Sequence, residues 1–84
     1  MLYYLITCRS LTYAQRTATV LERAGILTRT LRSPKRISSD GCGYCVRVAK
    51  RDLEMAKKIL HQSGLEPKRV FAAMSDGGYM EMTL

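Results

Sequence analysis

The sequence is poor in the residues on which most catalytic and metal sites depend. Its 84 residues include no tryptophan, a single histidine and only seven acidic residues. The one histidine, His61, is far along the chain from the cysteines, so no Cys–His nucleophile pair is expected. The sequence also has no acid–base pair, zinc motif or phosphate-binding loop. We therefore do not expect an enzyme.

Long apolar runs are also absent. Residues 1–9 have no basic beginning and only a short apolar stretch, which argues against a secretion signal or a membrane span. The expected compartment is the reducing cytoplasm. Three cysteines, an odd number, do not suit a disulfide framework. In a reducing compartment, clustered thiols are more often reactive groups or metal ligands.

The charge is strongly one-sided. Fourteen Lys and Arg residues against seven acidic residues give a net charge of +7. This charge indicates an anionic partner, either an acidic protein surface or a nucleic acid. The overall composition is that of a globular chain. A single domain is expected over residues 1–74, with residues 75–84 forming a turn and a short C-terminal extension.

The order of predicted elements indicates the fold. Side-chain patterns predict strands over residues 3–8, 26–31, 44–49 and 70–74. Apolar residues three and four apart predict helices that begin near Ser10 and Asp52, and each ends at a glycine. This order predicts an α+β, ferredoxin-like split βαβ-βαβ fold, with a four-stranded antiparallel sheet and two helices on one face. Residues 79–84 are expected to add a short extra strand or to form a loose tail.

The predicted topology brings the three cysteines to one end of the sheet. Cys8 ends the first strand, while Cys42 and Cys45 begin the third, its antiparallel neighbour. The first helix begins at the same end, and its N–H groups favour a thiolate. Basic side chains expected nearby would add to this effect: Arg9, Lys35, Arg36 and Arg47.

Cys42 is the strongest candidate among these thiols. It lies between Gly41 and Gly43, which allow left-handed backbone conformations and would leave the sulfur uncovered. Cys45 follows at C-x-x-C spacing, close enough to form a disulfide or to share a soft metal. The alternatives are that Cys42 is an inert loop thiol and that Cys8 and Cys45 are ordinary core residues.

Several motifs resemble those of a known family. They are Tyr4-Leu5-Ile6-Thr7 with Arg9-Ser10, Ala24-Gly25-Ile26, and the stretch from Ser33 to Ser39 that leads to Cys42-Gly43. Over roughly residues 3–65 the chain resembles the selenium/sulfur carrier-like family of small bacterial domains. The resemblance implies that Cys42 carries a persulfide or perselenide between donor and acceptor proteins, with no other cofactor. Cys8 and Cys45 depart from the family pattern, which leaves room for disulfide resolution or metal binding.

The resemblance and the residue pattern together define a candidate site. Its catalytic residues would be Cys42 and Cys45. The expected substrate-binding residues are Arg9, Ser10, Lys35, Arg36, Ser38, Ser39, Gly41 and Gly43. The donor and acceptor proteins are expected to present acidic surfaces to this basic chain.

Two other functions remain open at this stage. An RNA-binding module would share the fold, but Cys42 stands where the first stacking aromatic residue should be. The positive charge predicts only weak, nonspecific binding of nucleic acid. A soft-metal chaperone would hold copper or zinc through Cys8, Cys42 and Cys45.

Overall fold

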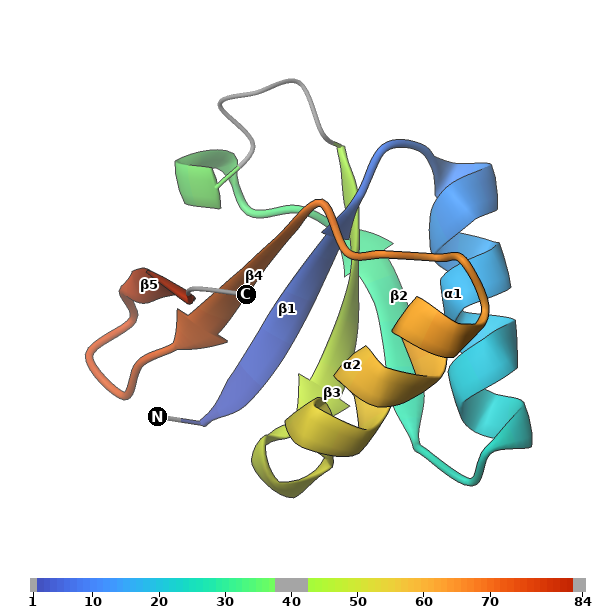
Figure 1. The fold of residues 1–84 in the computed structure, drawn as a ribbon. Helices are drawn as coiled ribbons and strands as arrows, with labels where there is room; N and C mark the ends of the chain where they lie inside the picture. The colour runs from blue at the N-terminus through green and yellow to red at the C-terminus, as the bar shows by residue number, and fades with distance from the viewer. Residues whose placement is uncertain (1, 38–42, 83–84) are drawn as a thin grey trace.

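The computed structural model describes residues 2–37 and 43–82. Along the chain these residues form β1 (Tyr3–Cys8), α1 (Leu11–Arg23), β2 (Thr28–Arg32), β3 (Tyr44–Ala49), α2 (Leu53–Gln62), β4 (Arg69–Ala73) and β5 (Tyr79–Met82) (Figure 1). Two short 3-10 turns, η1 (Lys35–Ile37) and η2 (Lys50–Asp52), precede β3 and α2. None of the described helices is long and apolar enough to cross a membrane.

The strands form a single antiparallel sheet in the order β2-β3-β1-β4-β5. The predicted α+β fold, with an antiparallel sheet and two helices, is confirmed. The prediction of four strands is wrong, because the sheet has five. The fifth strand, β5, corresponds to the short extra strand that the sequence left open.

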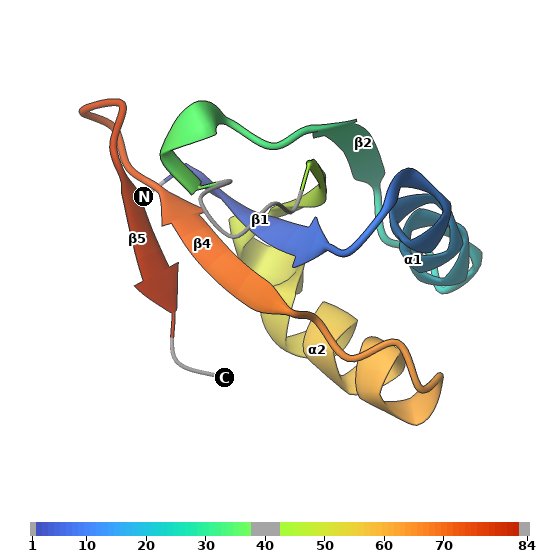
Figure 2. The same cartoon turned by 90° about the horizontal axis from the view of Figure 1, so that it is seen from above.

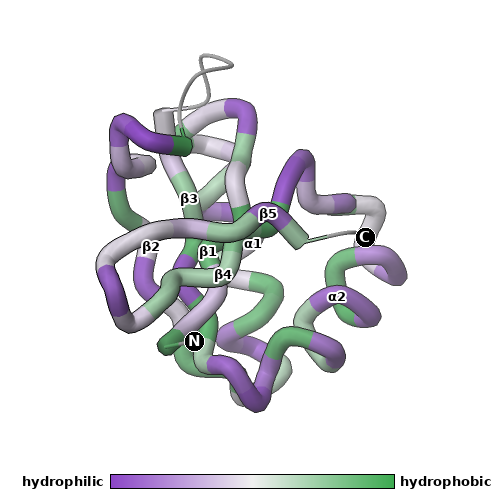
Figure 3. Tube along the Cα trace, turned by 90° about the vertical axis from the view of Figure 1, so that its left-hand side faces the viewer, coloured by the Kyte–Doolittle hydropathy of each residue, from purple (hydrophilic) through white to green (hydrophobic). Residues whose placement is uncertain are grey.

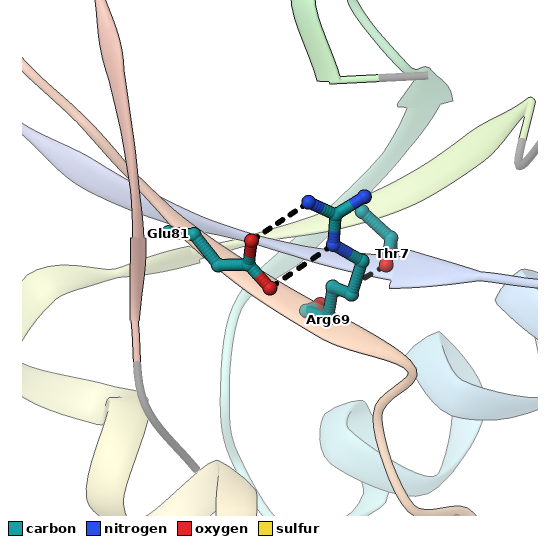
Figure 4. Close-up of polar contacts among 3 residues, drawn as sticks. All are labelled: Thr7, Arg69 and Glu81. Carbon is teal, nitrogen blue, oxygen red and sulfur yellow. Dashed lines mark hydrogen bonds and ion pairs between the residues drawn. The ribbon is translucent and has the colours of Figure 1, made fainter. Parts of the chain in front are cut away.

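A tight turn and an ion pair hold β5 against β4. Gly77 has a φ of +87°, which favours glycine, and the Met74 N–H donates to the Gly78 carbonyl at 2.8 Å. Beyond this turn, the Arg69 guanidinium donates to both carboxylate oxygens of Glu81, at 3.0 and 2.7 Å (Figure 4). This ion pair joins β4 to β5 and adds a side-chain contact to the backbone pairing of the two strands.

Both helices begin where the sequence predicts, but only the first has a side-chain cap. The Ser10 side chain accepts a hydrogen bond from the Tyr13 N–H at 3.1 Å and caps α1. Asp52 stands at the N-cap position of α2, but its side chain makes no such bond, and η2 leads directly into the helix.

Both helices cover one face of the sheet, as predicted. The buried residues Ala14 and Leu21 of α1 and Leu60 of α2 belong to one core cluster with Ile6 and Val46 of the central strands. Hydrophobic and hydrophilic residues alternate along α2, as expected for a helix with one buried side (Figure 3).

The opposite face of the sheet carries a second, smaller cluster. It consists of Leu5, Ile37, Cys45 and Phe71, all buried. Three of these residues come from strands, whereas Ile37 belongs to η1, which lies on the side of the sheet away from α2 (Figure 2). We call this side the open face because neither α1 nor α2 covers it; of η1, Ile37 packs against it.

Candidate functional site

The segment that contains the principal candidate thiol lies between two fixed points. Ser38, Ser39, Gly41 and Cys42 are outside the described residues. Before them, Ile37 is buried in the open-face cluster, with 3% of its surface exposed. After them, the Gly43 carbonyl accepts a hydrogen bond from the Ser33 N–H at 2.9 Å. The described chain therefore stops at Ile37, which packs on the open face, and resumes at Gly43, which is bonded to the residue after β2.

Gly43 does not have the backbone conformation that the sequence suggested. The described glycines with a positive φ are Gly25, Gly64 and Gly77. A Cβ added to Gly43 would meet no atom within 4 Å. Gly43 therefore needs neither a left-handed backbone nor the lack of a side chain to keep this local structure.

Cys45 is a buried residue of the open face. It has no exposed surface and packs with Leu5, Ile37 and Phe71. In the sheet it lies opposite Thr7 on one side and Leu31 on the other. Its thiol is therefore shielded from a partner protein, in part by Ile37, the residue directly before the segment 38–42.

Cys8 is buried on the opposite, helix-covered face. Its Sγ lies 3.7 Å from the Ile6 carbonyl oxygen and 4.0 Å from the Thr17 hydroxyl. Cys8 and Cys45 are at the same end of neighbouring strands, as predicted. However, Cys8 pairs with Tyr44, so Cys45 is one residue out of step with it, and successive side chains of a strand alternate between faces. The two thiols therefore share one end of the sheet but lie on its opposite faces.

The predicted basic residues do not form a single cluster. The Arg9 guanidinium lies 4.8 Å from the centre of the Tyr13 ring, just after the end of β1. The Arg47 guanidinium lies 4.0 Å from the centre of the Tyr3 ring, where β1 begins. Lys35 and Arg36 belong to η1, and Arg36 donates to the Gly77 carbonyl at 3.1 Å. The guanidinium groups of Arg9 and Arg47 thus lie near opposite ends of β1.

The sequence did not reveal a pair of tyrosines on the open face. Burial raises the pKa of Tyr79, and Tyr3 raises it further through its charge and a hydrogen bond, while Arg36 acts in the opposite direction. Tyr3 and Tyr79 lie on either side of Ala73 in the sheet register. The alternation of side chains along each strand could have indicated which face each tyrosine occupies. The two tyrosines come together only because β5 joins the sheet.

A cavity beside Cys8 was also not foreseen. Its volume is about 230 Å³, and it lies between the end of β1, the first turns of α1 and the α2–β4 connection. Its lining includes Cys8, Tyr13, Thr17, Pro67 and Lys68. Cys8 lines this hollow, although only 3% of its surface is exposed.

The described residues include no group of three or more His, Cys, Asp and Glu side chains that could hold a metal ion. Cys8 and Cys45 point to opposite faces of the sheet, so one ion cannot bind both without a change of register. The soft-metal hypothesis required Cys8 and Cys45 to bind the same ion, and their positions do not allow this.

Comparisons with known proteins give one match. Residues 3–72 match the model of the family described as "Putative Se/S carrier protein-like". No curated protein matches the chain, and no solved structure matches it. The matched range contains β1 to α2, all of β4 except its last residue, and all three cysteines, and it ends before β5. The chain therefore belongs to the Se/S carrier protein-like family.

Proposed function

We propose that this protein carries sulfur or selenium as a persulfide or perselenide on Cys42. The family match over residues 3–72 is the observation that supports this function most strongly. Burial of the other two thiols supports the choice of residue, because Cys8 is 3% exposed and Cys45 is not exposed at all. Both thiols therefore present little or no surface to a partner protein.

The proposed transfer is a sulfur exchange without net oxidation. The Cys42 thiolate attacks the terminal sulfur of a donor persulfide and forms a new S–S bond. The original S–S bond breaks, and the donor leaves as a thiolate. The acceptor protein then attacks the terminal sulfur on Cys42 in the same way, and Cys42 returns to a thiolate. Selenium would follow the same route as a perselenide.

The scaffold proposed for this chemistry is a ferredoxin-like split βαβ domain extended by β5. Its first six elements follow the β-α-β-β-α-β order, and a net charge of +7 suits donor and acceptor proteins with acidic surfaces. A reducing compartment such as the cytoplasm would keep the thiols available. Cys45 would act as a resolving thiol only if Ile37 moved away from it, because the two pack together.

Intact-mass analysis tests this proposal. The protein is incubated with a cysteine desulfurase and cysteine, and in parallel with a selenium donor, and is then analysed without reductant. We expect a gain of one sulfur or selenium atom in the wild type and in the Cys8→Ala and Cys45→Ala variants. The gain should disappear in Cys42→Ser.

The control is a second carrier protein that the same enzyme loads under the same conditions. If that carrier gains sulfur while the wild-type chain does not, the proposed function is wrong. A gain that persists in Cys42→Ser would show that another thiol carries the cargo, which would overturn the assignment of Cys42.

A further inference from the structure

A patch of apolar and basic residues lies at the end of the open face where β1 begins. Leu2, Tyr3, Leu27, Arg29 and Arg47 surround a hollow of about 260 Å³, with Thr28 and Ala49 completing its lining. Two of the described chain's exposed large hydrophobic residues meet here, since Leu2 is 59% and Leu27 is 83% exposed. We call these residues the Leu27 patch.

Two arginines of the Leu27 patch oppose each other without an acidic partner. Arg29 and Arg47 are directly paired across β2 and β3, and both are exposed. Within residues 2–37 and 43–82, neither takes part in a salt bridge. Like charges placed opposite each other on a sheet are destabilising, so an anionic group bound between them would be favourable.

The contacts of Tyr3 decide between two classes of anionic partner. Single-stranded nucleic acids bind sheet faces by stacking bases on exposed aromatic rings. Here the Arg47 guanidinium already lies 4.0 Å from the centre of the Tyr3 ring and takes the place of a base. The exposed side chains that remain are aliphatic and suit an apolar protein side chain better than a base.

We propose that the Leu27 patch binds a short acidic, leucine-containing segment of a partner protein. Carboxylates of that segment would pair with Arg29 and Arg47. An aliphatic side chain would enter the hollow beside Leu2, Leu27 and Ala49. Exposed apolar side chains next to unneutralised charges are typical of such interaction surfaces.

The Leu27 patch is separate from the beginning of β3. β3 runs from Tyr44 to Ala49, which is about 16 Å at the usual strand rise, and the patch includes Ala49 at its far end. A short segment bound within the patch would therefore lie at the opposite end of β3 from Gly43. The inference does not depend on what chemistry Cys42 performs.

Binding of a defined peptide tests this proposal. A peptide of alternating glutamate and leucine is titrated into the ¹⁵N-labelled Cys42→Ser variant, so that the result is independent of sulfur loading. We expect saturable shifts of amide signals at Leu2, Leu27, Arg29 and Arg47. Arg29→Glu with Arg47→Glu should weaken binding about tenfold or more.

A second double variant, Arg16→Glu with Arg23→Glu, is the control for net charge. These exposed arginines lie on α1, and the double variant should bind the peptide as the parent protein does. A lysine–leucine peptide should not bind. Absence of shifts at the Leu27 patch, or equal loss of binding in both double variants, would overturn the proposal. Tighter binding of oligo-uridine than of the acidic peptide at the same residues would assign the patch to RNA instead.

Discussion

Tyr79 is the described residue whose ionisation responds most clearly to its surroundings. It lies on the open face beside Tyr3, and its pKa is raised above the ordinary value of 10.0, chiefly by burial. Folding therefore disfavours the charged tyrosinate. Above the ordinary pKa, the unfolded chain loses this proton more readily than the folded chain does. The stability that depends on neutral Tyr79 is thus fully present below the ordinary pKa and is lost as the pH rises through the folded-state pKa.

This linkage predicts a specific effect of Tyr79→Phe. Between about pH 9 and pH 11, the free energy of unfolding of the wild type should fall more steeply than that of the variant. Urea denaturation of both proteins across this range measures the difference. Parallel curves would contradict the assigned role of Tyr79.

The candidate site shows which residue-level features a sequence can reveal. Val46 and Val48 alternate with Arg47, so the pattern of β3 already indicated that Cys45 shares the face of Arg47. In β1 every residue from Tyr3 to Ile6 is apolar or aromatic, so the sequence could not tell which side Cys8 faces. The burial of Ile37 could not be predicted either, because it depends on η1 folding back over the sheet.

At the scale of elements, β5 depends on contacts made across strands. The Arg69–Glu81 pair joins residues 12 apart in sequence (Figure 4), and the Arg69 carbonyl also accepts a hydrogen bond from the Thr7 hydroxyl at 3.1 Å. Arg69 therefore links β1, β4 and β5. The turn residues Asp76-Gly77-Gly78 indicated a reversal of the chain. A four-residue edge strand has too little pattern of its own to be separated from a loose tail.

Glu81→Gln should loosen β5 without unfolding the domain. The side chains of Arg69 and Glu81 are 29% and 49% exposed, so we expect a loss of stability below about 1 kcal/mol. The local effect should be larger, with faster hydrogen exchange of the amides of residues 79–82.

Glu54→Gln is a matched control for this prediction. Glu54 is 88% exposed and forms a longer pair of 3.7 Å with Lys57 on α2. It should leave exchange in β5 unchanged. Equal exchange rates in wild type and Glu81→Gln would show that backbone pairing and the turn alone hold β5.

At the scale of the whole molecule, the excess positive charge predicts weak and unselective binding to RNA. The net charge is +7, and the Arg47–Tyr3 contact occupies an aromatic ring on the open face. Binding should come from phosphate contacts and fall steeply as salt is added. Fluorescence anisotropy with a uridine oligomer and a mixed-sequence oligomer of equal length tests this. Binding that resists salt or strongly prefers one sequence would contradict the prediction.

The way the chain is anchored around residues 38–42 also affects how this protein can vary. Ile37 is held by burial and Gly43 by its bond to Ser33, so the domain is secured on both sides of this stretch. Insertions and deletions here should therefore be inexpensive for folding. The length and sequence of residues 38–42 could therefore be changed to suit different protein partners while the rest of the domain stays the same.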